Sequence, residues 1–347
     1  MERKIFHSDK ILKHLGRVKS WMEGGNPYPV TVEFDMTNQC NHACPGCIGT
    51  ANKDKSDHLS KKRAKDIIYE LGTLGIKGLM FSGGGEPLMH PYTIDMVTRA
   101  AEQGIDAGFI TNGTLLDDDS ARILVDNCKW IRISLDADGP EMYKMTHGVD
   151  EDIWHRTLAN IKMLVDTKRR EETDVTIGIG FLTSEKTAPG MLEATRVAKE
   201  LGVDYIQFRA YYNDTFDIGS YNYFSKCQEL ENEQFKVVCS YSRCDEIRKY
   251  NRLTPYYRGY DKCYGHQFAT VIGADAKVYL CCHMRGKEEY ILGDLNTNSF
   301  WGIWHSDRRK EVIEKLTFKD CIPFCRCDPF NKILWQLKKE REHVNFL

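Results

Sequence analysis

The chain has 347 residues, of which 41% are hydrophobic and 28% are charged, and its formal net charge is −2. This length suits one large α/β domain followed by a smaller appendage. The balanced charge excludes a highly charged disordered protein and a polycation built for nucleic acid, so no nucleic-acid partner is expected.

No apolar run approaches the roughly 18 to 20 residues that cross a bilayer, and residues 1–19 lack the apolar centre of a secretory signal. We therefore expect a cytoplasmic protein with no membrane partner. The chain contains 13 cysteines. In a reducing compartment such thiols favour metal binding or catalysis over a disulfide framework.

Short apolar strands alternate with amphipathic helices over the first two thirds of the chain. The expected strands are Thr31–Met36, Gly78–Ser82, Ala107–Thr111, Trp130–Leu135, Val175–Leu182 and Tyr205–Phe208. The expected helices are Ser60–Leu74, Pro91–Gln103, Asp117–Asn127, Asp152–Thr167 and Pro189–Leu201. Such alternation predicts an α/β fold, a parallel sheet with the helices outside it.

Polar residues recur at alternate positions in three of these strands. They are Glu33 and Asp35, then Arg132, Ser134 and Asp136, then Gln207 and Arg209. Side chains two residues apart point to one side of a strand, and a parallel sheet covered on both faces is nearly all apolar. The pattern favours a partly open barrel whose lumen holds a polar ligand. The alternative is chance alternation with salt-bridged strand ends.

The pattern changes after the sixth strand. Residues 211–260 are rich in Tyr, Asn and Asp and indicate a connector with some helix around 230–238. Strands are then expected at 267–272 and 277–281 around a Gly273–Asp275 turn, followed by helices near 300–316 and 331–343.

Three cysteines, Cys40, Cys44 and Cys47, follow directly after the first strand. Thiolates separated by three and then two residues can coordinate three irons of a cubane, which leaves the fourth iron without a protein ligand. A structural zinc site closes its shell with four ligands, whereas an open position marks a catalytic metal. His42 could in principle complete a zinc site, but its place inside the loop between Cys40 and Cys44 makes that geometry awkward.

Three motifs together resemble the radical S-adenosylmethionine (SAM) superfamily: the three cysteines, Gly83-Gly84-Gly85-Glu86-Pro87 after the second strand, and Ser134-Leu135-Asp136 at the end of the fourth. The similarity covers about Val30 to Arg209. One departure is Gly46, where many members carry an aromatic residue that packs near adenine. The resemblance implies a 4Fe-4S cluster on Cys40, Cys44 and Cys47 whose unique iron chelates the methionine moiety of SAM. One electron, from a donor such as flavodoxin or ferredoxin, then cleaves SAM to a 5'-deoxyadenosyl radical that abstracts a substrate hydrogen.

Residues at the carboxyl ends of the strands are the candidates for binding SAM. The glycines Gly83, Gly84 and Gly85 let the backbone approach a ligand, although such a turn often merely reverses the chain. With Glu86 they are expected to bind the methionyl amine. Ser134 and Asp136 are placed to bond the ribose, and Asn112 lies at the same rim. Arg209 could hold the carboxylate of SAM or form a structural ion pair, and both interpretations stay open.

Six further cysteines form a second group that is dense enough to favour metal binding over buried thiols. They are Cys263, Cys281, Cys282, Cys321, Cys325 and Cys327. Their arrangement around a hairpin and a helix resembles the SPASM extension, or its shorter version, twitch, and implies one auxiliary 4Fe-4S cluster. Cys263 and Cys281 bracket the hairpin, and Cys321 and Cys327 are favoured from the closing group, with Cys325 the nearest competitor. A second auxiliary cluster would have to recruit Cys227, Cys239 or Cys244.

Cys282 is expected on the opposite face of its strand from Cys281, as core filler, substrate contact or hydrogen donor. Cys244 is a second candidate donor. The resemblances imply a partial (β/α)6 TIM-like barrel with a small C-terminal α+β auxiliary-cluster domain. The expected divisions are an N-terminal extension (1–29), the barrel (30–210), the connector (211–260) and the auxiliary-cluster domain (261–347).

Enzymes with such extensions oxidise sugars or alcohols, epimerise amino-acid residues or crosslink ribosomal peptides. The extension 1–29 is too short for a separate leader-peptide-binding domain, so the first expectation is a small polar substrate: a carbohydrate, aminocyclitol or nucleoside that is oxidised or epimerised. Five tyrosines offer rings for sugar contacts: Tyr205, Tyr211, Tyr212, Tyr221 and Tyr223. The alternative is a peptide-modifying epimerase or thioether maturase. An electron carrier that never cleaves SAM would leave the SAM motifs without a purpose.

Overall fold

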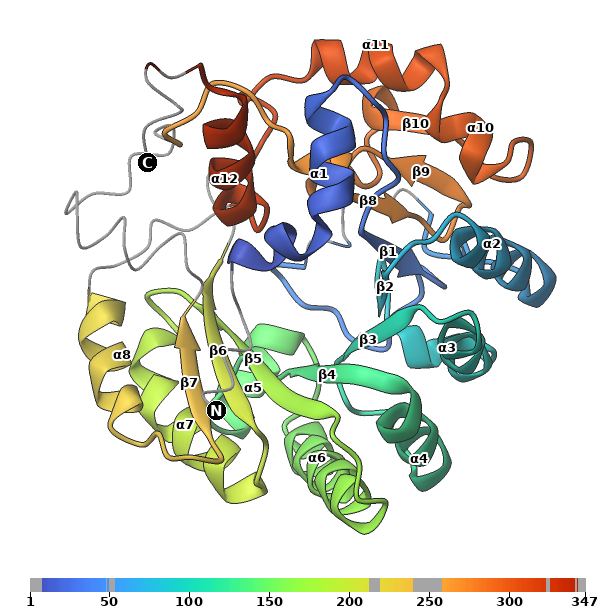
Figure 1. Cartoon of the computed structure of the whole chain (residues 1–347). Helices are drawn as coiled ribbons and strands as arrows, with labels where there is room; N and C mark the ends of the chain where they lie inside the picture. Colours follow the sequence, from blue (N-terminus) through green and yellow to red (C-terminus); the bar gives the residue numbers. More distant parts are fainter. Residues whose placement is uncertain are drawn as a thin grey trace.

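One ten-stranded sheet organises the computed structural model, which describes residues 8–47, 49, 54–211, 219–239, 258–322, 325–340 and 342. The strand order is β10-β9-β8-β1-β2-β3-β4-β5-β6-β7. The six predicted strands are confirmed to within two residues as β1 (Thr31–Asp35), β2 (Gly78–Ser82), β3 (Asp106–Thr111), β4 (Cys128–Ser134), β5 (Thr176–Thr183) and β6 (Tyr205–Ala210). All five pairings between them are parallel. Figure 1 shows them side by side around an arc.

Helices cover the outside of this arc (Figure 1). The five predicted helices are confirmed to within three residues as α2 (Lys61–Thr73), α3 (Thr93–Glu102), α4 (Asp118–Asn127), α6 (Asp152–Arg170) and α7 (Met191–Leu201). Local signals set their ends: the Ser60 side chain accepts from Arg63 N at the start of α2, and Asp117 and Ser120 form a capping box before α4. α5 (Pro140–His147) was not predicted, although Pro140 opens it and Gly148 closes it at a φ of 63°.

The two faces of the sheet differ in polarity, as the alternation predicted. Val32 and Phe34 of β1 belong to the main apolar core together with Ile67 and Leu71 of α2. Glu33 therefore points to the opposite side, which we call the inner face. The apolar outward residues of the other strands, among them Phe81, Phe109, Ile131, Ile179 and Phe208, belong to the same core. The outer face of the sheet therefore contributes to the apolar core, whereas polar side chains lie on the inner face.

The C-terminal region continues the barrel sheet instead of forming a separate one. β8 (Ala269–Ile272) pairs in parallel with the free edge of β1, and β9 (Lys277–Tyr279) and β10 (Ile291–Asp294) follow as antiparallel strands. The sequence predicted the β8–β9 hairpin but not its pairing with β1, because pairing between distant strands leaves no local signal. The four-part division of the chain stays a prediction.

Two helix predictions after β6 were wrong. Residues 230–238 are not helical: α8 (Gly219–Gln228) ends earlier, and β7 (Lys236–Cys239) pairs in parallel with β6. The β-branched Val237 and Val238 suit this strand, which only the exposed edge of β6 makes available. The predicted helix 300–316 is split into α10 (Phe300–Trp304) and α11 (Asp307–Lys315), because Ser306 caps α11 by accepting from Arg309 N.

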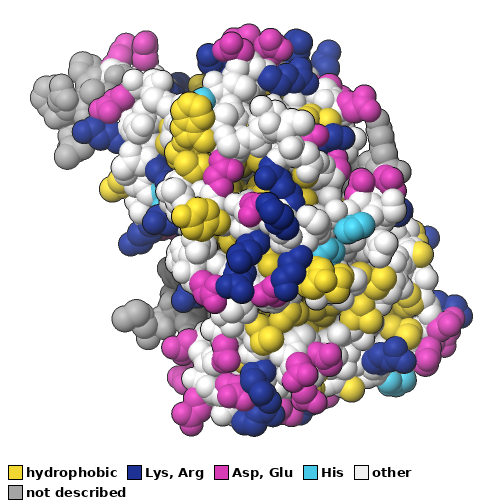
Figure 2. All heavy atoms as spheres, turned by 90° about the vertical axis from the view of Figure 1, so that its right-hand side faces the viewer, with side chains coloured by type: hydrophobic (Ala, Val, Ile, Leu, Met, Phe, Trp, Pro, Cys, Tyr) yellow, Lys and Arg dark blue, Asp and Glu magenta, His cyan; other side chains and the backbone are white. Residues whose placement is uncertain are grey.

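The N-terminal residues pack against the last helix. α1 (Leu15–Met22) buries Val18 and Trp21 in a small apolar cluster with Phe268 and with Leu334 of α12 (Asp328–Lys338). Figure 1 shows α1 and α12 next to each other. Figure 2 shows another face of the molecule, on which basic and acidic side chains are interspersed. None of the helices in the described part of the chain is both long and apolar enough to cross a membrane.

Candidate functional site

The three proposed cluster ligands lie in the loop that leaves the carboxyl end of β1. Cys40 and Cys47 are exposed, and Cys44 is half-buried. Burial raises the pKa of the Cys44 thiol to about 12, and Cys47 is the first of the neighbouring groups that raise it further, followed by Asp136 and Cys40. Backbone N–H groups of His42 and Gly49 point at the sulfurs of Cys40 and Cys47, at 3.4 and 3.3 Å. Three thiols on one loop, two of them supported by backbone N–H groups, suit a cubane held by three cysteines.

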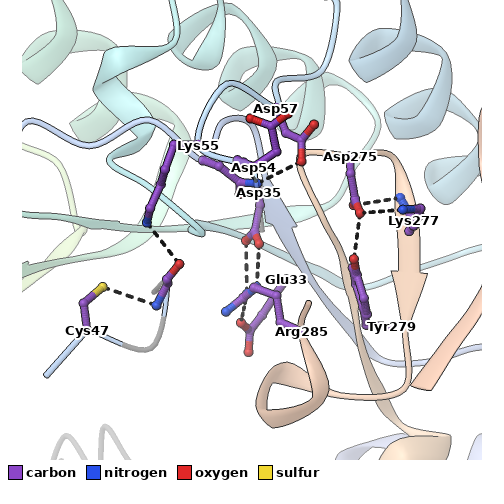
Figure 3. A network of polar contacts seen from close by, with 12 residues as sticks. Glu33, Asp35, Cys47, Asp54, Lys55, Asp57, Asp275, Lys277, Tyr279 and Arg285 are labelled. Atoms are coloured by element: carbon purple, nitrogen blue, oxygen red, sulfur yellow. Dashed lines mark hydrogen bonds and ion pairs between the residues drawn. The ribbon is translucent and has the colours of Figure 1, made fainter. Parts of the chain in front are cut away.

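Two contacts hold this loop in place. Lys55 Nζ donates to the carbonyl oxygen of Gly49 at 3.1 Å, beside Cys47 (Figure 3). On the other side of the loop, Ala43 N donates to the carbonyl oxygen of His147 at 3.0 Å. These two contacts anchor the loop that carries the three cysteines.

A zinc site that includes His147 does not fit the geometry. Ligand atoms of His42, Cys44 and His147 lie within 4.8 Å of one another. However, Nε2 of His147 lies 3.2 Å from the carbonyl oxygen of Ser134, and its Nδ1 lies 2.9 Å from Thr146 Oγ1. Both ring nitrogens are thus already hydrogen-bonded, so His147 is not available as a ligand.

The glycine-rich turn after β2 packs directly on the cysteine loop. Glu86 N donates to the carbonyl oxygen of Gln39 at 2.8 Å. A Cβ on Gly85 would overlap that same oxygen, and a Cβ on Gly49 would overlap the carbonyl oxygen of Gly84. The sequence attributed these glycines to approach of the backbone to a ligand. The structure adds a second reason, since two backbone segments that both serve the site touch here.

The Glu86 carboxylate anchors this turn to β3. It is 3% exposed. Its Oε1 accepts from Thr111 Oγ1 at 2.6 Å and from Leu88 N at 3.1 Å, and its Oε2 accepts from Asn112 N at 2.7 Å. Burial raises the pKa of Glu86 to about 7 against these hydrogen bonds. These contacts give Glu86 a task within the protein, and its direct contact with SAM stays a prediction.

Asn112 also connects protein segments. Its Nδ2 donates to Asn41 Oδ1 at 2.8 Å, and its Oδ1 accepts from Thr114 N at 3.0 Å. Since Asn41 follows Cys40, this side chain ties the end of β3 to the cysteine loop.

The rim formed by β4, β5 and β6 offers polar groups that fit SAM. Asp136 is buried at a φ of 47°, a left-handed conformation that Asp tolerates better than most residues, and its Oδ1 accepts from Leu182 N at 2.6 Å. Burial raises its pKa to about 6, and Arg209 is the first group opposing that shift. Among the described residues, the buried Ser82 Oγ and Arg209 Nε have no hydrogen-bond partner. Arg209 forms no ion pair with any other residue that the structure describes. This favours the interpretation in which Arg209 binds the carboxylate of SAM over the structural ion pair.

Glu33 and Asp35, expected to face a ligand, instead face two arginines of the C-terminal region. Arg285 Nη2 lies 2.8 Å from Glu33 Oε2, and its Nε lies 2.5 Å from Asp35 Oδ2 (Figure 3). Arg326 also contacts Glu33. Glu33, Asp35 and Arg285 are buried. Neither arginine was predicted from the sequence, although the run Cys325-Arg326-Cys327 places one of them between two candidate ligands.

Arg285→Met should strongly destabilise the protein, because it leaves the buried Glu33 and Asp35 without this cation. Breaking a buried pair by removing one partner costs about 3–5 kcal/mol. The matched control is Arg99→Met, which removes an exposed ion pair to Glu102 at 2.9 Å and should cost less than about 1 kcal/mol. Urea unfolding of both reconstituted variants measures the difference. Equal losses would contradict the buried network.

The second cysteine group converges on Cys325. The backbone N–H of Cys327 points at its sulfur at 3.3 Å. Burial raises the pKa of Cys263 to about 12, and Cys325 is the first charged neighbour adding to it. Cys325 likewise raises the pKa of Cys281, after burial and Cys282, and it raises that of Cys321, after burial. Which four of these cysteines hold the cluster stays a prediction.

Of the two candidate hydrogen donors, Cys282 and Cys244, the structure describes only Cys282. Cys282 is not on a strand, because β9 ends at Tyr279, and a short 3-10 helix begins at Cys282. Its buried side chain packs with Val271 and Tyr279. Cys244, with Tyr212, lies outside the described residues. The donor role of Cys282 stays a prediction.

Comparison with known proteins agrees with this geometry. The Radical SAM superfamily model matches residues 34–189, and the model of SPASM, an iron-sulfur cluster-binding domain, matches residues 263–328. Mycofactocin maturase MftC of Mycobacterium ulcerans is 29% identical over 133 residues, which are 38% of this chain. That match spans 36% of the relative, so about a third of its length is compared.

Two solved structures have a similar fold. SuiB of Streptococcus suis bound to its precursor peptide SuiA superposes with a TM-score of 0.67 and 15% identity, over 91% of this chain and 74% of that one. Native anSMEcpe with bound AdoMet and Cp18Cys peptide gives 0.61 and 17%, over 88% of this chain and 91% of that one. The chain thus contains a domain of the Radical SAM superfamily and a C-terminal SPASM iron-sulfur cluster-binding domain, and these two domains imply SAM and 4Fe-4S clusters as its cofactors.

Proposed function

We propose that this radical SAM enzyme modifies a peptide. SuiB and anSMEcpe were each solved with a peptide, and they share the fold over most of the chain. MftC is a maturase by name. These relatives support the alternative of the sequence analysis better than the small carbohydrate, aminocyclitol or nucleoside that it placed first.

Each rim residue has a proposed task toward SAM. Cys40, Cys44 and Cys47 would hold a 4Fe-4S cluster, which when bound would supply the electron for reductive cleavage of SAM. Arg209 holds the carboxylate of SAM, and Ser134 and Asp136 hold its ribose. The backbone of Gly83–Gly85 binds the methionyl amine, while Glu86 and Asn112 fix that backbone against the cysteine loop.

The observation that carries the reaction type is the contact between the auxiliary-cluster region and the inner face. Arg326 is flanked by two of the candidate ligands and contacts Glu33 of β1. An auxiliary cluster held by these cysteines would lie beside the barrel lumen. The proposed SAM-binding residues face the same lumen. We therefore propose an oxidation in which one hydrogen atom of the peptide would go to the 5'-deoxyadenosyl group of cleaved SAM, one electron to the auxiliary cluster and one proton to solvent. Epimerisation is the alternative, with Cys282 giving a hydrogen atom back.

Isotope labelling with candidate peptides tests both proposals. Peptides encoded by short reading frames beside this gene are incubated with the reconstituted enzyme, SAM and a reductant in deuterated water. Oxidation should give a peptide that has lost two hydrogen atoms and carries no new deuterium on carbon. One deuterium on carbon in a peptide of otherwise unchanged formula would reject oxidation and favour epimerisation. If a deletion strain accumulates a sugar or nucleoside while none of these peptides changes, the peptide proposal is wrong.

A further inference from the structure

The ring of Tyr211 is pressed against the cysteine loop. A Cβ built on Gly46 would overlap Cε1 of Tyr211 and would lie 2.8 Å from Cδ1 and from Cζ. The ring thus occupies the space that any side chain at position 46 would need. Tyr211 N donates to the carbonyl oxygen of Thr183 at 3.1 Å, which continues the pairing of β5 with β6. This hydrogen bond fixes the backbone of Tyr211 at the end of the sheet.

Tyr211 follows the polar side chains that lie on the inner face of β6. Gln207, Arg209 and Tyr211 are spaced two apart, so their side chains lie on one side of the extended chain. Phe208, between them, belongs to the outer apolar core. Tyr211 is consequently the next inward side chain after Arg209, at the carboxyl rim where the cysteine loop lies.

The ring lies near the proposed cluster ligands and near Asp136, one of the proposed ribose contacts. Burial raises the pKa of the Tyr211 hydroxyl, and the neighbouring Asp136, Cys44 and Cys47 raise it further. The residue as a whole is only half-buried. An aromatic surface is thus available beside the groups that would hold the two other parts of SAM.

We propose that Tyr211 is the side chain on which the adenine of SAM stacks, and that position 46 is glycine because this ring occupies its space. Every nucleobase has a π face that packs on aromatic rings. The inference rests on the SAM site described above and not on the identity of the substrate. Its failure would therefore leave the peptide proposal untouched.

Two ligands that differ only in the base separate stacking from a purely structural role. S-adenosylhomocysteine carries adenine, and S-ribosylhomocysteine lacks it. In reconstituted enzyme, Tyr211→Ala should weaken binding of S-adenosylhomocysteine about 5- to 150-fold, the range of one base–aromatic contact. Binding of S-ribosylhomocysteine, measured by competition with labelled SAM, should not change. Tyr211→Phe keeps the ring and should bind both ligands as the parent enzyme does.

Equal weakening of both ligands by Tyr211→Ala would mean that the ring only supports the loop, and the proposal would be overturned. No weakening of either ligand would overturn it as well. Iron content, measured in every variant, shows whether the clusters are retained.

Variants that transfer the aromatic ring from position 211 to position 46 test whether the two positions share one space. Gly46→Phe alone should weaken binding of S-adenosylhomocysteine, because its side chain collides with Tyr211. Combining Gly46→Phe with Tyr211→Ala should restore binding to within a few fold of the parent enzyme. The matched control is Gly46→Leu with Tyr211→Ala, which fills the space without an aromatic face and should stay weak. Restoration by leucine, or none by phenylalanine, would contradict the stacking role.

Discussion

Replacing Cys40, Cys44 and Cys47 together with alanine should lower the iron of anaerobically reconstituted protein from about eight to about four atoms per chain, the content of one 4Fe-4S cluster. The remaining iron belongs to the auxiliary cluster, whose candidate ligands all lie beyond residue 262. Formation of 5'-deoxyadenosine should be abolished, because no unique iron is left to bind SAM. Iron analysis and product chromatography under dithionite measure both effects.

The matched control for the triple variant is Cys128→Ala. Cys128 begins β4, is buried among apolar residues and belongs to neither cysteine group. This variant should keep about eight irons and full SAM cleavage. Finding one zinc and no iron in the unmodified protein after anaerobic purification would end the iron-sulfur assignment.

Gly85→Ala should reduce 5'-deoxyadenosine formation by about a hundredfold or more, because its Cβ would collide with the backbone of Gln39. The Cβ would overlap the carbonyl oxygen and lie 2.5 Å from the carbonyl carbon, where no flexible side chain can move aside. The turn and the cysteine loop would have to separate, and a misplacement of about 1 Å in a reacting geometry costs about 10²-fold. Rates are measured in reconstituted protein whose iron content is known.

Gly139→Ala is the control for this substitution. Gly139 has a φ of −171°, which is ordinary extended backbone, and a Cβ there would meet nothing within 4 Å. Its rate should stay close to that of the parent enzyme. Unchanged SAM cleavage in Gly85→Ala would show that close packing of the turn on the cysteine loop is not required.

The predictions that held rest on short-range patterns. Alternation of apolar and polar residues located the six barrel strands and their inward polar side chains, because the period of a strand is set by its own backbone. The spacing of Cys40, Cys44 and Cys47 was sufficient for the cofactor, since three ligands of one cluster lie within eight consecutive residues. The prediction that failed at residues 230–238 depended on a partner elsewhere: Val237 and Val238 form a strand because β6 offers an edge. The split of the predicted helix 300–316 has a local cause, the cap at Ser306.

The sequence by itself was sufficient to predict the α/β barrel, the radical SAM motifs and the auxiliary-cluster domain. Each of these features depends on patterns among residues that are close together along the chain. Only the tertiary structure decided which groups meet. It joined β8 to β1, paired Arg285 with Glu33 and Asp35, and set Tyr211 against Gly46. These contacts link residues that are up to 252 positions apart. No local period or spacing encodes them, because they arise when buried charges require partners and when the sheet brings distant strands to one rim.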